Sequence, residues 1–102
     1  MNPVFHPEAG IEFEEAVFYY RARGRTLGGR FAEEVRKTIR RILGAPGRWR
    51  VLEEEVRVCS MRIFPYQVLY TLERDYILIL AVAHGKRRPG YWKHRLHSKP
   101  VN

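Results

Sequence analysis

The sequence predicts an α+β fold, in which a short N-terminal strand and a helical hairpin pack on a small antiparallel sheet. Two patterns lead to this fold class. In the first half of the chain, apolar residues recur at helical spacing in two stretches, whereas the second half holds β-rich stretches separated by turn signals. A chain of 102 residues has room for one core and two layers, so we expect residues 1–102 to form a single domain.

The N-terminal elements are a strand and a helix. Asn2–His6 is short, favours β-structure and is followed by a proline, which suits a brief edge strand. Pro7 suits the first position of a helix over residues 7–23, and Gly24 suits its end. One stripe of this helix is apolar and comprises Phe13, Ala16, Val17 and Tyr20, while Glu12, Glu14 and Glu15 lie off the stripe.

A second helix is expected over Arg30–Leu43, after a short polar turn. Its apolar residues keep helical spacing, and Gly44 and Pro46 end it. Two helices joined by so short a link form an antiparallel hairpin. We expect Ala45–Glu54 to be a loop, with Trp49 packed against the edge of the core.

Three β-rich stretches follow. Val56–Phe64 and Tyr66–Leu72 are separated by Pro65. In the second stretch, Tyr66, Val68, Tyr70 and Leu72 share one face, and the residues between them share the other. Tyr76–Ala83 is uncharged throughout, which indicates a strand that is buried on both faces. The three stretches predict a meander of three antiparallel strands, and we take Tyr76–Ala83 as the central strand of the sheet.

The central strand runs into a cationic segment, His84–Arg95. The chain has a net charge of +8, and no acidic residue follows Asp75. Such a balance favours a polyanionic or acidic partner, because charge steers association and binding releases counterions. The alternative is a solvated basic face that serves only solubility.

Cysteine usage and hydropathy exclude several classes of protein. Cys59 is the only cysteine, so the sequence predicts neither a disulfide framework nor a multi-cysteine metal site, and we expect a buried thiol there. No signal peptide and no apolar run of the ~20 residues needed to span a bilayer is present. We therefore expect a soluble, cytoplasmic protein without metal or cofactor.

Several motifs resemble the RelE/ParE family of toxins from type II toxin–antitoxin operons, the plasmid-stabilisation type. They cover nearly the whole chain and lie at residues 14–20 in the first helix, 30–31 in the second, 62–70 in the sheet and 81–92 at the end. The last of these reads Ala81-Val82-Ala83-His84-Gly85-Lys86-Arg87-Arg88-Pro89-Gly90-Tyr91-Trp92. Its paired arginines, followed by proline, tyrosine and tryptophan, are the most specific match.

The resemblance implies a growth-inhibiting toxin that a cognate antitoxin neutralises, in a toxin–antitoxin hetero-oligomer. It leaves two targets open. Members similar to ParE inhibit DNA gyrase and are not nucleases, whereas members similar to RelE cleave messenger RNA on the ribosome. A third class, a non-toxic nucleic-acid-binding module, rests on charge and aromatic residues alone, and no helix-turn-helix, RRM or KH signature supports it.

A RelE-like nuclease would use His84, Arg87 and Tyr91 as catalytic residues. RNA cleavage needs a group that activates the 2′-hydroxyl, cations that stabilise the transition state and an acid for the leaving oxygen. Under either mechanism the candidate target-binding residues are Arg62, Gln67, Lys86, Arg88, Trp92 and Arg95. The alternative role of His84 is to cap a strand, and that of Tyr91 and Trp92 is to pack the C-terminal segment against the sheet.

Gln67 departs from the nuclease pattern. Ribonuclease members of the family usually carry an arginine at this position, and that arginine holds the phosphate. An amide is neutral, so a transition-state contact of ~2–4 kcal/mol would be missing. We therefore favour ParE-like inhibition of DNA gyrase over RelE-like cleavage.

Overall fold

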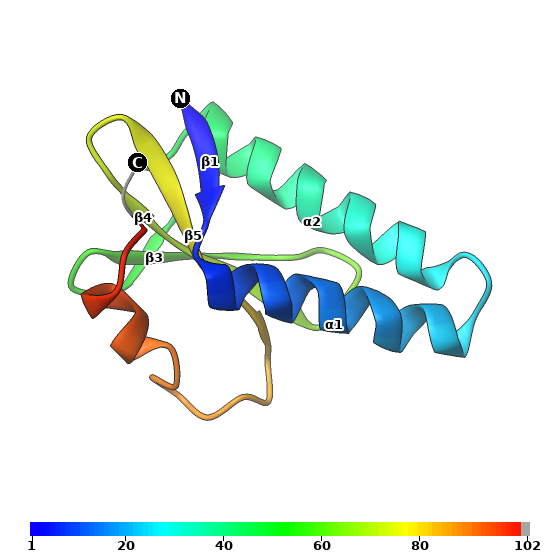
Figure 1. The fold of residues 1–102 in the computed structure, drawn as a ribbon. Coiled ribbons are helices and arrows are strands. Elements are labelled where there is room, and N and C mark those ends of the chain that lie inside the picture. The colour runs from blue at the N-terminus through cyan, green and yellow to red at the C-terminus, as the bar shows by residue number, and fades with distance from the viewer. Residues whose placement is uncertain (101–102) are drawn as a thin grey trace.

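The computed structural model describes residues 1–100; Val101 and Asn102, which the predicted domain includes, lie outside the described residues. The elements follow the predicted α+β order (Figure 1). They are β1 (Asn2–Phe5), α1 (Pro7–Arg23), α2 (Leu27–Gly44), β2 (Arg50–Glu53), β3 (Val56–Ser60), β4 (Tyr66–Leu72), β5 (Tyr76–His84) and a short 3₁₀ helix, η1 (Lys93–His97).

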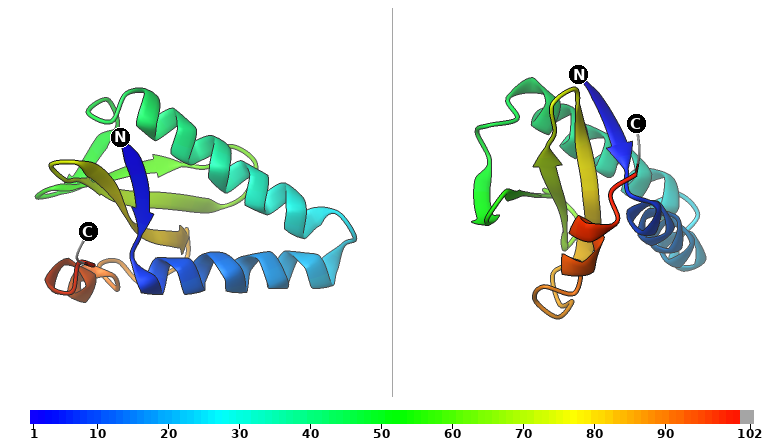
Figure 2. Two further views of the ribbon diagram at one scale, coloured as in Figure 1. Left: turned by 45° about the horizontal axis from the view of Figure 1, so that its top comes forward. Right: turned by 60° about the vertical axis from the view of Figure 1, so that its left-hand side comes forward.

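The strands form one sheet in the order β1-β5-β4-β3-β2. Each neighbouring pair from β2 to β5 is antiparallel, which confirms the predicted meander, and β1 pairs in parallel with β5. Helices α1 and α2 lie side by side as a hairpin, and η1 lies at the opposite end of the molecule from the hairpin tip (Figure 2). The edge position of β1 is also as predicted.

The core has two parts, one on each face of the sheet. On the helix side, Phe31 and Ile42 of α2 pack against Val68 and Tyr70 of β4. On the other face, Trp92 packs against strand residues that include Val58, Leu69 and Leu80. Every residue from Ile77 to Ala83 is buried, which confirms that this strand is covered on both faces. It is an interior strand, but the middle position of the sheet belongs to β4 and not, as predicted, to β5.

The second helix begins at Leu27, three residues before the predicted start at Arg30. Gly28 and Gly29 had suggested a turn. Gly28 is instead the point at which the two helices approach each other: a Cβ there would lie 3.0 Å from the Val17 carbonyl oxygen. Only glycine fits this crossing without displacing the backbone of α1.

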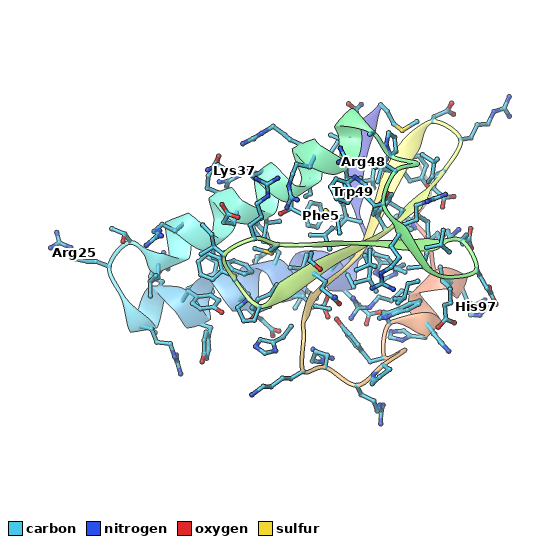
Figure 3. The ribbon with its side chains drawn as sticks, turned by 180° about the vertical axis from the view of Figure 1, so that it is seen from behind. Phe5, Arg25, Lys37, Arg48, Trp49 and His97 are labelled. Atoms are coloured by element: carbon cyan, nitrogen blue, oxygen red, sulfur yellow. The ribbon has the colours of Figure 1, made fainter. Side chains whose placement is uncertain are left out.

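Two expectations for residues 45–64 were wrong. The predicted loop Ala45–Glu54 contains β2, which pairs with β3 at the edge of the sheet. The strand predicted over Val56–Phe64 ends at Ser60, because Met61 to Pro65 turn so that the Met61 amide donates to the Tyr66 carbonyl at 3.0 Å. Trp49 does pack against the core edge, and its indole lies beside the end of α2 (Figure 3).

Candidate functional site

The site is built around the C-terminal half of β5, where the edge of the strand that faces β1 has no strand partner. β1 pairs only with Tyr76–Ile79, so the β1-facing edge of β5 beyond Ile79 has no strand partner. Side chains take the place of a strand there. The Glu12 carboxylate accepts from the Val82 amide at 3.0 Å, and the Arg95 guanidinium donates to the Leu80 carbonyl at 3.0 Å. Both backbone groups are thereby satisfied, as buried backbone groups need to be.

Glu12 and Arg95 also bind each other through two hydrogen bonds of 2.8 and 3.0 Å. The Glu12 side chain is 10% exposed and that of Arg95 is 5% exposed, so water screens the pair little. The Nε of Arg95 is the one buried side-chain nitrogen or oxygen in residues 1–100 that has no hydrogen bond, and it lies 3.6 Å from a Glu8 carboxylate oxygen. Helix α1 thus holds the C-terminal segment through a buried ion pair.

Tyr91 is the third member of this cluster. Its hydroxyl donates to Glu12 at 2.5 Å, and the Arg87 guanidinium lies over its ring at 3.8 Å from the ring centroid. Arg95 lies near the same ring, at 5.1 Å, and Arg87 is also 3.8 Å from a Glu12 oxygen. The phenol is therefore held between two guanidinium groups and a carboxylate.

These contacts set the protonation of Tyr91 and Arg95. Burial, together with the hydrogen bond to Glu12, raises the pKa of the Tyr91 phenol above its ordinary value. Burial alone would lower the pKa of Arg95, but the hydrogen bonds and charge of Glu12 outweigh it and raise that pKa. Tyr91 therefore keeps its proton and donates a hydrogen bond to Glu12, and Arg95 keeps its positive charge.

His84 lies at the end of β5 on the helix side of the sheet. Its ring meets Tyr66 edge-on at 5.0 Å between centroids, and its Nδ1 accepts from the Lys86 amide at 3.0 Å. This contact is the strand-end cap that the sequence offered as the alternative role. His84 also lines a cleft of about 410 Å³ between α1 and the end of β5.

Gln67 lies on the other face of the sheet. It pairs in register with Ala83, and Tyr66 pairs with His84, so the amide and the imidazole project to opposite sides. Gln67 lines a second cleft, of about 240 Å³, together with Arg87, Arg88, Tyr91 and others. Arg87 and His84 line both clefts, so His84 and Gln67 project to opposite faces of the sheet but both border the second cleft.

The remaining candidates divide by burial. Lys86 and Arg88 are exposed on the basic loop, which we define as residues 85–90 between β5 and Tyr91. Arg62 is exposed on the neighbouring turn, which is joined to the basic loop by a hydrogen bond from the Gly85 amide to the Pro65 carbonyl at 2.8 Å. Trp92 and Arg95 are 3% and 4% exposed, so their side chains pack and pair inside the protein instead of offering a surface to a target.

Glu12 is the residue of this site that the sequence did not reveal. It lies off the apolar stripe of its helix, as a solvated glutamate would, and its main partner Arg95 is 83 residues away. The sequence carried one relevant signal, the absence of acidic residues after Asp75. The cations of the C-terminal segment have to find their counter-ions in the first three-quarters of the chain.

Three further properties of the described chain bear on its chemistry. Among residues 1–100, no three His, Cys, Asp or Glu side chains gather so that they would hold a metal ion. None of the helices in that part of the chain is long and apolar enough to cross a membrane. Cys59 is buried, and burial raises the pKa of its thiol, as expected for a structural cysteine.

Comparison with known proteins agrees with the resemblance seen in the sequence. The family model described as the ParE toxin of type II toxin-antitoxin system, parDE, matches residues 4–89. A solved structure, the chromosomal ParDE TA system from P. aeruginosa, shares the fold: its TM-score is 0.72 at 14% identity, covering 82% of this chain and 95% of that one. Among curated proteins none matches this sequence significantly. Since the family model spans most of the chain, from β1 through β5 into the basic loop, this protein belongs to the ParE family of type II toxin–antitoxin toxins.

Proposed function

We propose that this toxin arrests growth by binding and inhibiting DNA gyrase, and that the exposed cations of the basic loop make the contact. The observation that carries the proposal is the state of the residues that a nuclease would need. They are engaged in structural contacts or lie on different faces of the sheet. Inhibition by binding needs no acid, base or phosphate clamp, so these arrangements do not impair it.

The acid–base groups argue against cleavage of messenger RNA. The Tyr91 hydroxyl donates a hydrogen bond to Glu12, and burial raises the pKa of this phenol, so the phenolate that would act as a base is disfavoured. As an acid, Tyr91 would have to break the hydrogen bond to Glu12 first. His84 Nδ1 accepts a hydrogen bond from the Lys86 amide, so this ring nitrogen is already engaged and would have to leave that contact before it could take a proton from a substrate.

The residues that would hold the phosphate also argue against cleavage of messenger RNA. Gln67 is neutral and supplies no charge to a phosphate oxygen. Arg87 lies over the ring of Tyr91 and beside the Glu12 carboxylate, which offsets part of its positive charge. A RelE-like enzyme built from these residues would have one partly neutralised cation at its phosphate site.

The basic loop is suited to contact with a protein surface. Lys86 and Arg88 are exposed, and neither makes an ion pair within the described part of the chain. The loop follows directly from β5, which is buried on both faces, so its first residues are held by a rigid strand. We propose that Lys86, Arg88 and the neighbouring Arg62 bind acidic groups of gyrase, and that Trp92 and Arg95 support the loop from beneath.

The proposal includes a cognate antitoxin. The ParDE system that shares this fold pairs a toxin with an antitoxin, and membership of the family extends this pairing to the present chain. A net charge of +8 favours an antitoxin with an acidic toxin-binding segment. Because gyrase and its DNA are its targets in this account, we propose that the toxin acts in the bacterial cytoplasm.

Pulse labelling after induced expression tests the proposal. Incorporation of labelled thymidine is expected to stop before incorporation of labelled methionine, and purified toxin is expected to inhibit gyrase supercoiling while leaving ribosome-bound messenger RNA intact. If methionine incorporation stops first and purified ribosomes with toxin yield cut messenger RNA, the protein is a RelE-like endoribonuclease and the proposal is wrong.

A further inference from the structure

A second cationic surface lies at the end of α2, separate from the clefts that flank β5. Four cations line a groove of about 460 Å³ there, three from α2 and one from the turn between β3 and β4. We call this surface the α2 patch, and its members are Lys37, Arg40, Arg41 and Arg62. Arg62 is shared with the proposed gyrase contact, but the three helical cations have no part in it.

The α2 patch keeps an excess of positive charge. Glu34 is the only acidic residue that lines the groove, and it lies 3.9 Å from Lys37. Arg40 pairs with Glu33 at 3.0 Å. Neither Arg41 nor Arg62 makes an ion pair with any residue of the described chain, so these two guanidinium groups remain available to an external anion.

The Arg41 side chain is held in place by the fold, whereas Arg62 is anchored only through its backbone. One guanidinium nitrogen of Arg41 donates to the Thr38 hydroxyl at 3.2 Å and to the Ser60 carbonyl at 3.1 Å. Arg62 stands at the tip of a turn whose flanking residues, Met61 and Phe64, are buried. A pre-positioned arginine loses little side-chain freedom when it binds, which favours affinity.

The composition of the groove selects the chemistry of its ligand. None of its lining residues is aromatic, and Trp49, whose ring lies 5.5 Å from the Arg41 guanidinium, packs against the core. The groove therefore lacks the row of exposed rings on which proteins that bind single-stranded nucleic acids stack bases. Guanidinium groups match the oxygens of a phosphodiester, and phosphate contacts alone bind a duplex without reading its sequence. Lys37 projects from α2 (Figure 3), and its side chain is 59% exposed, so it is open to a partner from solution.

From these observations we infer that the α2 patch binds the phosphodiester backbone of a nucleic-acid duplex, without sequence preference. This activity goes beyond the binding of gyrase and does not depend on it. A toxin with both surfaces would contact a DNA-bound enzyme and the nucleic acid beside it.

Fluorescence anisotropy with the full-length protein tests the inference. The probe is a fluorescein-labelled duplex of about 20 base pairs, titrated at several salt concentrations, because log Kd varies with log salt by about 0.9 per phosphate contact. Arg41→Ala/Arg62→Ala is expected to reduce this slope by about 1.8 and to weaken binding at least about tenfold near 0.1 M salt. A DNA duplex and an RNA duplex of the same sequence, run in parallel, identify which nucleic acid is the preferred source of the phosphates.

The matched control is Arg25→Ala/Arg74→Ala. Arg25 lies in the turn between α1 and α2, far along the hairpin from the α2 patch (Figure 3), and Arg74 lies in the turn before β5. The control loses the same charge and is expected to keep the wild-type slope. Should Arg41→Ala disturb folding through its lost contact with Ser60, Arg62→Ala alone is expected to lower the slope by about 0.9.

Three results would overturn the inference. The two double variants would weaken binding equally if net charge alone attracted the duplex. The α2-patch variant would bind like the wild type if the groove took no phosphate. A loss of slope confined to Lys86→Ala/Arg88→Ala would assign duplex binding to the basic loop instead.

Discussion

At the scale of single residues, Glu12 connects three parts of the chain. Its carboxylate accepts hydrogen bonds from the β5 backbone, from Tyr91 and from Arg95, so a single glutamate fixes the strand end and the segment after the basic loop. Removing one partner of a buried ion pair leaves the other charge uncompensated, which costs more than the pair contributes by itself. Glu12 is therefore the residue whose loss the fold tolerates least in this region.

We predict that Glu12→Gln destabilises the protein by about 3–5 kcal/mol, because Arg95 keeps its charge inside the protein and only the half-exposed Glu8, 3.6 Å away, remains to offset it. Urea denaturation measures the free energy of unfolding. Glu33→Gln is the control, since it removes a glutamate that also pairs with arginine but on the exposed side of α2, and it is expected to have little effect. An equally small effect of Glu12→Gln would mean that the cluster does not hold the C-terminal segment.

The roles of individual residues were harder to predict from the sequence than their burial. Cys59 was expected to be a buried thiol, and it is 1% exposed, because a lone cysteine behaves as a small apolar side chain. Tyr76–Ala83 was expected to be buried on both faces, and it is, because an uncharged run reports burial directly. Glu12 and Arg95 gave no such signal. Their pairing depends on where β1 ends, which exposes one edge of β5, and no local pattern records that edge.

At the scale of elements, the regions that sequence reasoning missed are those in which burial gives no pattern. All four residues of β2 are exposed, so neither face of this edge strand shows an apolar alternation. The first turn of α2 contains a glycine pair that has the composition of a loop. Its helical state follows from close packing against α1, a tertiary cause that propensity does not contain.

The segment after the basic loop acts as a cover for the second face of the sheet. Trp92 is 3% exposed and packs in the cluster that contains Leu69, Leu80 and Ala83. We predict that Trp92→Ala costs about 3–5 kcal/mol of folding stability, whereas Trp92→Phe costs distinctly less because it fills more of the cavity. Thermal or urea unfolding of the two variants measures the difference.

Direct contact of Trp92 with a target would give a different result from packing. If this side chain contacted a target directly, Trp92→Ala would lose toxicity while its unfolding free energy stayed that of the wild type. The packing role predicts the opposite for Trp92→Phe, which is expected to fold well and remain toxic.

At the scale of the whole molecule, the separation of charge along the chain has a structural explanation. Several of the cations after Asp75 pair with acids of the earlier elements: Lys93 with Glu53, Arg95 with Glu12, and Lys99 with Glu73. These pairs hold the C-terminal segment on the scaffold. The cations left over, Lys86 and Arg88, lie on the basic loop, so the surplus positive charge is concentrated where we propose the target binds.

The same pairs predict how stability depends on pH. Burial alone would raise the pKa of Glu73, but hydrogen bonds from Thr71 and Lys99 outweigh it and hold that pKa below its ordinary value of 4.5. The unfolded chain then binds a proton at a pH at which the folded chain does not. The stability that ionised Glu73 contributes to the folded protein is fully present above about pH 4.5, and it is lost as the pH falls through the pKa of Glu73 in the folded protein.

Unfolding free energies at about pH 6.5 and about pH 3.5 check this prediction. The loss of stability on acidification is expected to be smaller in Glu73→Gln than in the wild type. Glu14→Gln, an exposed change on α1, controls for the loss of one carboxylate and is expected to keep the wild-type difference. An unchanged pH dependence in Glu73→Gln would show that the pair with Lys99 does not form in solution.

The most direct measurement of the central claim is gyrase supercoiling in the presence of purified toxin variants. We predict that the wild type and Arg25→Ala/Arg74→Ala inhibit supercoiling alike, and that Lys86→Ala/Arg88→Ala raises the concentration needed for inhibition at least about tenfold while its unfolding free energy changes by less than about 1 kcal/mol. Full inhibition by a stable Lys86→Ala/Arg88→Ala variant, or no inhibition by the wild type, would contradict the account.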